Sequence, residues 1–106
     1  MKKTIKSKLE FGEVFHNGKR ASSKLVRISA INNESDSGRV AFVAAKRLGN
    51  AVYRNHCKRI LREAARMCEL PKDGYSIIMF ATKNTYNAKP SDVARDLEKL
   101  LVKIEN

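Results

Sequence analysis

The sequence predicts a single α/β (α+β) domain in which helices cover one sheet, in the order helix, strand, strand, helix, strand, helix. Three observations lead to this expectation. The length of 106 residues suits one domain. The spacing of apolar residues alternates between the helical period of about 3.6 and the strand period of about 2. Apolar residues make up 42% of the chain, enough for one modest core, with no repeat or interdomain linker, so the domain is expected to span 1–106.

The first expected helix follows a loose basic arm over residues 1–6. Ser7 and Glu10 are spaced as in a capping box, which predicts where the helix begins. Gly18 is expected to end it, because glycine readily adopts a left-handed conformation at a helix stop. The apolar residues between these points share one helical face: Phe11, Val14 and Phe15.

The next segment predicts strands. Residues 19–24 are expected to form a basic connector or a short edge strand. Residues 25–31 alternate apolar and polar side chains, as a strand with one buried face does, and residues 40–45 are a second candidate strand. The polar segment 32–38 has the composition of a turn. The two strands are therefore expected to pair as an antiparallel hairpin.

Two further elements follow toward the C-terminus. Residues 75–82 are apolar on both faces, which is typical of a central strand. After a loop over 83–90, Ser91 is expected to cap a last helix. The core stripe of that helix consists of Val93, Leu97, Leu100, Leu101 and Ile104.

The helix expected over 51–68 has the clearest pattern in the chain. At about 100° per residue its apolar side chains gather on one side: Tyr53, Cys57, Ile60, Leu61, Ala64 and Cys68. The opposite side is basic, with Asn55 among its cations: Arg54, Lys58, Arg59, Arg62 and Arg66. Glu63 is the single acidic residue of this helix.

The positive charge is concentrated in the first part of the chain. Residues 1–66 hold sixteen Lys and Arg against five Asp and Glu, whereas residues 67–106 hold six of each, so the net charge of +11 lies in the first part. On the basic helix, Arg59–Glu63 is the one attractive pair at i,i+4 spacing, and the others repel. A polyanion would relieve this repulsion, so we expect RNA or DNA to bind here rather than a merely solvated face.

Composition argues against several other classes. Cys57 and Cys68 are eleven residues apart without a CxxC motif, which fits neither a zinc site nor a disulfide framework. The basic N-terminus lacks the apolar run of a secretory signal, and no apolar stretch is long enough to span a membrane. We therefore expect a protein of the reducing cytoplasm.

One stretch resembles a known family. Residues 46–63 read KRLGNAVYRNHCKRILRE. This is similar to the signature of the bacterial ribonuclease P protein: a basic pair, an apolar residue, Gly-Asn-Ala-Val, then Arg-Asn-x-x-Lys-Arg-x-x-Arg-Glu. Every fixed position of the pattern is filled. The resemblance extends over nearly the whole chain, including the first helix, the apolar strand near 75–82 and the final helix.

The resemblance implies an accessory subunit of an endoribonuclease whose large RNA carries out catalysis. The expected partners are ribonuclease P RNA and precursor tRNA, from which the holoenzyme removes the 5′ leader; no obligate protein partner is expected. Mg²⁺ would be held mainly by the RNA, with no metal or catalytic residue dedicated to the protein. The family fold also implies a left-handed crossover between parallel strands, although about 98% of such crossovers are right-handed.

The resemblance also implies two RNA-binding surfaces. The first, for the catalytic RNA, comprises Lys46, Arg47, Asn50, Arg54, Asn55, Lys58, Arg59 and Arg62, to which the charge pattern adds Arg66. The second is a cleft for the leader that includes Phe11 and Phe15, unless these residues pack in the core; we expect at least one of them to do so. Arg27 and Ser29 stand where relatives often have an aromatic, so we expect either weaker contacts with the leader or a cation from Arg27 in place of stacking.

Three alternatives compete with this interpretation. A non-catalytic RNA scaffold of ribosomal type would be equally small and basic. An RRM-like sheet binder would need strand aromatics that this chain lacks. A protein-only nuclease would need clustered carboxylates, or a general base such as His56. His56 lies between the apolar and basic sides of its helix, which favours a half-buried residue or an RNA contact.

Overall fold

The computed structural model describes residues 8–32, 38–71 and 74–105. The elements are α1 (Lys8–Asn17), β1 (Lys19–Ser22), β2 (Val26–Asn32), β3 (Arg39–Val43), the short 3₁₀ helix η1 (Lys46–Leu48), α2 (Ala51–Met67), β4 (Tyr75–Ala81) and α3 (Pro90–Glu105). The expected α+β order is confirmed, and β1 is the short edge strand that was one of two expectations for its segment. The expected basic arm and the Ser7 cap lie outside the described residues.

The sheet has the strand order β1-β2-β4-β3. The predicted hairpin between β2 and β3 is wrong, because β4 lies between them, antiparallel to β2 and parallel to β3. The physical reason is burial. Five of the seven residues of β4 are buried, on both of its faces, so β4 needs a central position with a neighbour on each side. Its expected role as a central strand is therefore confirmed.

The antiparallel hairpin of this fold joins β1 to β2 instead. Ser23 closes the tight connection: its Oγ accepts hydrogen bonds from the N–H groups of Leu25 and Val26, each at 3.2 Å. Its own N–H donates to the carbonyl of Val26 at 2.8 Å. A serine that satisfies several backbone groups in this way favours a turn over a longer connector.

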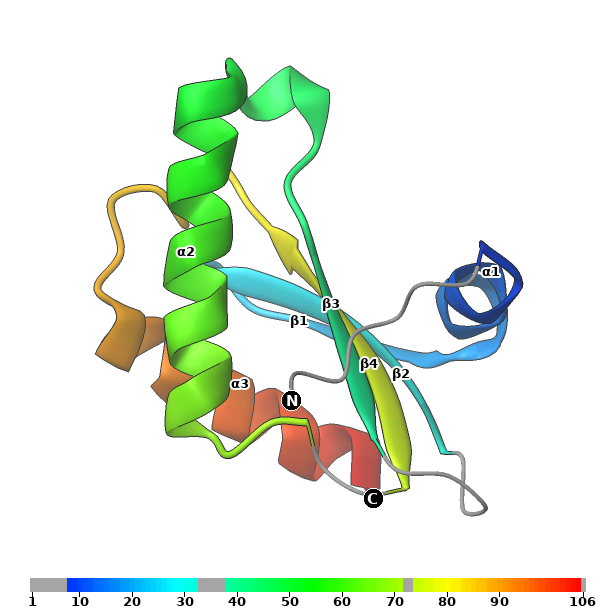
Figure 1. The fold of residues 1–106 in the computed structure, drawn as a ribbon. Helices are drawn as coiled ribbons and strands as arrows, with labels where there is room; N and C mark the ends of the chain where they lie inside the picture. Colours follow the sequence, from blue (N-terminus) through cyan, green and yellow to red (C-terminus); the bar gives the residue numbers. More distant parts are fainter. Residues whose placement is uncertain (1–7, 33–37, 72–73, 106) are drawn as a thin grey trace.

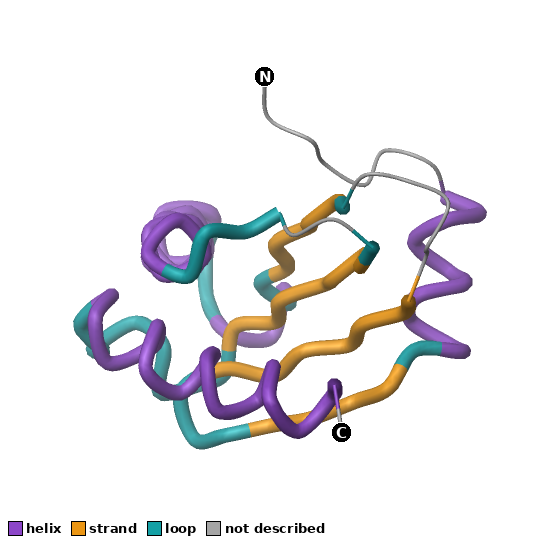
Figure 2. The backbone as a smooth tube through the Cα atoms, turned by 90° about the horizontal axis from the view of Figure 1, so that it is seen from below, coloured by secondary structure: helices purple, strands orange, loops and turns teal. Residues whose placement is uncertain are grey.

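The helices cover the sheet unequally (Figure 1). On one face α2 packs over β3 and β4, and α3 packs over β1 and β2, with the two helices also in contact. On the other face α1 packs on β2 and β4. The view from below shows the strands between α1 on one side and the other two helices on the other (Figure 2). The main core therefore lies under α2 and α3, and much of the α1 side of the sheet is open.

The main core is formed by alternating strand residues and the apolar sides of the two long helices. The buried strand residues are Val26, Ile28, Ala30, Val40, Ile77, Met79 and Ala81. The helical residues are Cys57, Ile60, Leu61, Ala64, Ala65, Val93, Ala94, Leu97, Leu100 and Ile104. The predicted core stripes of α2 and α3 are largely confirmed, with Tyr53, Cys68 and Leu101 partly buried beside them.

On the open side, a buried hydrogen bond joins α1 to β2. The Oγ of Ser29 donates a hydrogen bond to the carbonyl of Val14 at 2.7 Å, and both residues are buried. Gly18 lies beside this contact. A Cβ on Gly18 would collide with the Val14 carbonyl oxygen and come within 2.8 Å of the Ser29 Oγ. The expected left-handed stop is wrong: glycine is needed here because helix and strand approach closely.

Helix α2 begins and ends with identifiable caps. Asn50 caps α2, its Oδ1 accepting from the Tyr53 N–H at 2.9 Å. At the other end the Leu70 N–H donates to the Ala65 carbonyl at 2.9 Å, with Glu69 at φ 60 in the left-handed region. This is a Schellman-type ending, with Glu69 where glycine is usual.

The start of α3 differs from the prediction. Pro90 is its first residue, and the N–H groups of Asp92 and Val93 donate to the carbonyl of Lys89. Ser91 lies inside the first turn, so it does not cap the helix. Proline suits the first helical position because its missing N–H would have no partner there.

The chain between the parallel strands β3 and β4 passes through α2, so the expected crossover is present. Its left-handed sense stays a prediction from the resemblance. Within the described residues no helix is both long and apolar enough to cross a membrane.

Candidate nucleic-acid interface

The first candidate surface is the basic side of α2 together with η1. We call it the α2 basic face. Its exposed members are Lys46, Arg47, Asn50, Asn55, Arg59, Arg62 and Arg66, and its half-buried members are Arg54 and Lys58. The amphipathic helix alone explains their placement, because the apolar side of α2 packs on the sheet and on α3. Eight of the nine residues predicted for the catalytic RNA thus lie on η1 and α2, and the ninth, Asn50, is the cap of α2.

Two arginines of this face have defined surroundings. The Arg62 guanidinium carbon lies 5.8 Å from the ring centroid of Phe42 on β3, a cation–π contact that orients the side chain. The Nε of Arg54 is buried and, among the described residues, has no hydrogen-bond partner. An unpaired buried donor is costly, so Arg54 would gain from an incoming acceptor once its side chain moves to expose the Nε.

The acidic residue of α2 pairs differently from the sequence expectation. Glu63 accepts two hydrogen bonds from Arg66, one of them from Nε at 3.2 Å. No ion pair to Arg59 forms within the described part of the chain. The hydrogen bonds from Arg66 hold the pKa of Glu63 below its ordinary value. Arg66 is therefore partly neutralised, whereas Arg59 and Arg62 are not.

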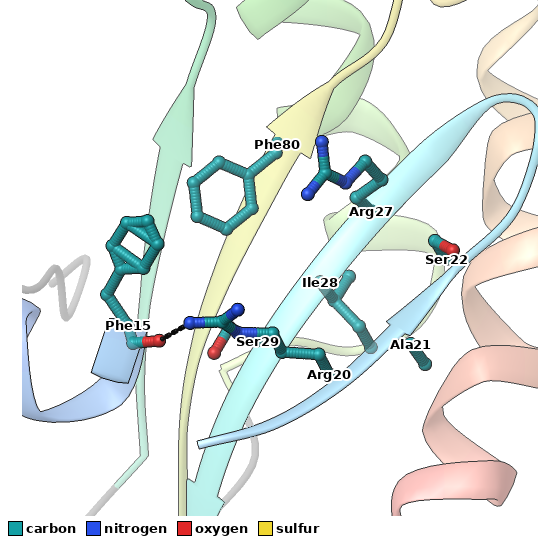
Figure 3. A pocket seen from close by; sticks show the side chains of 8 residues that line it. All are labelled: Phe15, Arg20, Ala21, Ser22, Arg27, Ile28, Ser29 and Phe80. Atoms are coloured by element: carbon teal, nitrogen blue, oxygen red, sulfur yellow. Dashed lines mark hydrogen bonds between the residues drawn. The ribbon is translucent and has the colours of Figure 1, made fainter. Parts of the chain in front are cut away.

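The second candidate surface is a groove of about 280 Å³ on the open side of the sheet (Figure 3). We call it the α1 groove. Its lining comes from four elements: Phe15 of α1, Arg20, Ala21 and Ser22 of β1, Arg27, Ile28 and Ser29 of β2, and Phe80 of β4. The strand register explains the grouping, because Arg27 is directly opposite Ser22 on one neighbour and Phe80 on the other.

Aromatic rings and guanidinium groups lie side by side in this groove. The rings of Phe15 and Phe80 are 5.8 Å apart between centroids. Arg20 lies over the Phe15 ring at 5.2 Å and donates a hydrogen bond to the Phe15 carbonyl at 2.7 Å. This combination of π faces and guanidinium groups is the kind that holds single-stranded nucleic acid. Arg27 is exposed beside Phe80, as Figure 3 shows.

The two phenylalanines predicted for the leader cleft differ in position. Phe15 is 37% exposed and lines the groove. Phe11 is half-buried and makes an edge-to-face contact with Phe15 at 6.3 Å, outside the groove lining. The expectation that at least one of them packs in the core is wrong: neither is among the buried core residues, whereas Val14 of the same helix is 0% exposed. Phe11 therefore supports Phe15 rather than facing the groove.

Sequence reasoning missed Arg20 and Phe80. Phe80 was counted with the apolar strand, although it is two residues from Ile78, an even spacing that puts both on the face opposite Ile77 and Met79. Arg20 was placed in a segment that could be a connector or an edge strand. Its spacing of two from Ser22 would put both side chains on one face of a strand. Neither pattern predicts a groove unless the order of the strands in the sheet is also known.

Several titratable side chains lie outside these two surfaces. Among the described residues, no group of three or more His, Cys, Asp or Glu could hold a metal ion. Burial raises the pKa of the Cys57 thiol, and burial together with Glu98 raises that of Cys68. His16 stacks on Phe15 at 5.3 Å, and His56 is exposed rather than half-buried, with its ring 4.7 Å from that of Tyr86.

Comparison with known proteins gives a consistent result. A family model described as Ribonuclease P matches residues 1–105. The chain is 35% identical over 103 residues to the ribonuclease P protein component of Syntrophus aciditrophicus, covering 93% of this chain and 84% of that one. It is similar to the RNase P protein structure from Staphylococcus aureus (TM-score 0.79, 26% identity, 100% of both chains) and to that from Thermotoga maritima (TM-score 0.80, 25% identity, 99% and 100%).

Proposed function

Because the chain belongs to the ribonuclease P protein family, we propose that it binds the catalytic RNA of ribonuclease P and the 5′ leader of precursor tRNA, and so assists endonucleolytic removal of the leader. The observation that carries this proposal is the presence of two cationic surfaces on opposite sides of one sheet: the α2 basic face and the α1 groove. Such an arrangement allows two RNA segments to be held at once.

The α2 basic face is proposed to bind the catalytic RNA. Its arginines suit phosphate because a guanidinium donates two parallel hydrogen bonds to an oxyanion. Its lysines and arginines repel one another in the free protein, and neighbouring phosphates remove this repulsion. Structured RNA is recognised largely through its backbone and shape, which a rigid helix with fixed charges matches.

The α1 groove is proposed to bind the leader. Precursor leaders differ in sequence, so the protein needs contacts that tolerate any base. Stacking on Phe15 and Phe80 meets this requirement, because every base has a π face. Arg20 and Arg27 supply the positive charge for the backbone, and the hydroxyls of Ser22 and Ser29 line the same groove. Here Arg27 would act as a cation, as the sequence suggested.

The protein is proposed to position RNA rather than to cut it. The described residues offer no cluster that fits a divalent metal, so no step is assigned to a protein-bound ion. Mg²⁺ held by the RNA would supply the charge stabilisation and activated water of phosphodiester hydrolysis. The protein contributes by neutralising phosphate repulsion between the two RNAs, which would lower the magnesium concentration needed. A protein with this role would act in the cytoplasm, where tRNA precursors are made.

Reconstitution tests the proposal. The protein is mixed with a bacterial ribonuclease P RNA, and precursor tRNA cleavage is measured at low magnesium. The expected result is stimulation by the wild-type protein and weak stimulation by Arg59→Ala/Arg62→Ala. The matched control is Arg95→Ala/Lys99→Ala, two exposed cations of α3. No stimulation by the wild-type chain would favour an RNA scaffold role, and cleavage without added RNA would favour a protein nuclease.

A further inference from the structure

A third surface, outside both sites described above, is formed by aromatic side chains between α2 and the loop that precedes α3. We call it the aromatic platform; it consists of Tyr53, His56 and Tyr86. The rings of Tyr53 and Tyr86 stack nearly parallel, 4.2 Å apart with an interplanar angle of 3°. The His56 ring lies 4.7 Å from Tyr86 at a tilt of 56°. In Figure 1 the loop over 82–89 passes beside α2.

The inner ring of the platform is held by the start of α2. Tyr53 is half-buried against Gly49, where an added Cβ would lie 2.8 Å from the Tyr53 Cγ. Gly49 has an extended φ of 162°, which any residue adopts, so the need for glycine here is the space taken by the ring. The glycine of the Gly-Asn-Ala-Val segment thus makes room for Tyr53, and Tyr53 supports Tyr86.

The outer ring is not needed to hold its own loop. Thr85 is fully buried, and its Oγ1 donates to the Leu25 carbonyl at 2.7 Å. Thr82 and Asn84 both donate to the carbonyl of Lys24, at 2.7 and 3.2 Å. These bonds fasten the loop to the β1–β2 connection. Tyr86 can therefore be changed without releasing the loop, and its 38% exposure is available to a ligand.

Charge around the platform indicates the occupant. Arg59 follows His56 by one helical turn and is exposed, and it belongs to the α2 basic face. Lys83 and Lys89 are exposed in the loop that carries Tyr86. Exposed aromatic rings flanked by cations fit an unpaired nucleotide, whose base stacks while its phosphate meets the lysines and arginine. An acidic protein segment would leave the aromatic rings without a stacking partner, and an apolar segment would leave the cations without an anion.

We propose that Tyr86, supported by Tyr53 and flanked by His56, stacks on an unpaired base of the catalytic RNA at the edge of the α2 basic face. The inference rests on the proposed function and adds a binding site to it. The catalytic RNA is favoured over the leader because the platform adjoins α2, whereas the α1 groove opens on the other side of the sheet. Backbone contacts by α2 would set affinity, and the platform would select a position where a base is unstacked.

The test compares Tyr86→Leu, which keeps apolar bulk but removes the ring, with Tyr86→Phe, which keeps the ring. Affinity for a ribonuclease P RNA transcript is measured over a salt series. Tyr86→Leu is expected to weaken binding about tenfold at every salt concentration, because stacking neutralises no phosphate. Tyr86→Phe is expected to bind within about twofold of the wild type, since the stacking ring is kept. Arg59→Ala, by contrast, is expected to flatten the salt dependence.

The outcomes separate this proposal from the proposed function. Wild-type affinity in Tyr86→Leu, with weakened binding in Arg59→Ala, would overturn the platform and leave the function intact. Wild-type RNA affinity in all of the variants would count against the proposed function itself. Equal loss in Tyr86→Leu and Tyr86→Phe would mean that the hydroxyl, not stacking, is used. A loss seen only for leader-bearing precursor would assign the platform to the leader and overturn the proposal.

A second measurement does not depend on substitution. The wild-type protein is photocrosslinked to a ribonuclease P RNA transcript containing 4-thiouridine, and crosslinked peptides are identified by mass spectrometry. The expected result is a crosslink within the loop over 82–89, at Tyr86. Crosslinks confined to α2 and η1, with none in this loop, would overturn the proposal even if Tyr86→Leu proved unstable.

Discussion

The α2 basic face and the α1 groove have similar chemistry but different origins. The first comes from one short segment of the sequence: its residues lie on η1, on α2 and at the cap between them, and a helical wheel is sufficient to group those of α2. The second is assembled from α1, β1, β2 and β4, whose residues are up to 65 positions apart, from Phe15 to Phe80. A site built on one helix depends on local periodicity, whereas the groove depends on strand order. The two sites should therefore respond differently to substitution.

The largest effect is expected on the α2 basic face. Arg59→Ala/Arg62→Ala removes two charge-assisted contacts at about 1.5 kcal/mol each, so affinity for ribonuclease P RNA should fall about 100-fold. The slope of log affinity against log salt should decrease by about two phosphate contacts. Filter binding over a salt series measures both quantities. The Arg95→Ala/Lys99→Ala control should match the wild type, and an equal loss in this control would mean that net charge alone drives binding.

A smaller and more selective effect is expected in the α1 groove. Phe15→Leu keeps apolar volume but removes a stacking ring, worth about 1–3 kcal/mol per base, so affinity of the holoenzyme for leader-bearing precursor should fall about tenfold. Affinity for precursor without a leader, and for the catalytic RNA alone, should not change. Equilibrium binding of both substrates checks this. Equal loss for both substrates would show that the two surfaces are not independent.

A change outside both surfaces should affect stability alone. Glu69 has a φ of 60° at the end of α2, a conformation that costs a residue with a side chain about 1 kcal/mol relative to glycine. Glu69→Gly is therefore expected to stabilise the fold by about 1 kcal/mol and to raise the melting temperature by about 4 °C. Thermal unfolding measures it, with Glu69→Ala as the control that should bring no gain. Lower stability in Glu69→Gly would contradict this account of the helix ending.

The smallest effect is expected from the acidic residue within the basic face. Glu63→Gln removes the partner of Arg66, so RNA affinity should rise about twofold and the salt slope should steepen by up to about one contact. Arg66 lowers the pKa of Glu63. The ion pair is therefore fully formed at pH values above the ordinary carboxyl pKa, and it is lost as the pH falls through the lowered pKa of Glu63. The wild type should therefore approach Glu63→Gln in salt slope at acidic pH. A slope independent of both changes would show that Arg66 does not reach the RNA.

Much of the fold followed from local patterns. The bounds of α2 were predicted to within one residue at its C-terminal end, because apolar and basic residues alternate there at helical spacing over several turns. Strand β4, which is apolar on both faces, was correctly expected to be central. The caps were less predictable: Ser91 has the right chemistry, but Pro90 begins α3. Whether a residue caps a helix depends on the path of the preceding loop, and the type of a single residue does not encode that path.

The limits of sequence patterns are clearest in the strand pairing. Residues 32–38 have the composition of a hairpin turn, yet β2 and β3 are separated by β4. Two strands close in sequence have a small entropic advantage in pairing. The burial of both faces of β4 outweighs this advantage, and no inspection of residues 25–45 alone reveals the competitor. Phe80 and Arg20 were missed as groove residues for the same reason.

The sequence alone is sufficient for the amphipathic helix α2, its basic side and the family signature, because these features depend on neighbours within a few residues. Tertiary structure decided which strands meet, which side of the sheet stays open, and that Tyr86 stacks on Tyr53 across thirty-three positions. Those outcomes arise from competition among distant segments for the same buried surface. Which strands and side chains come together depends on the packing of the whole core, and no local sequence pattern encodes it.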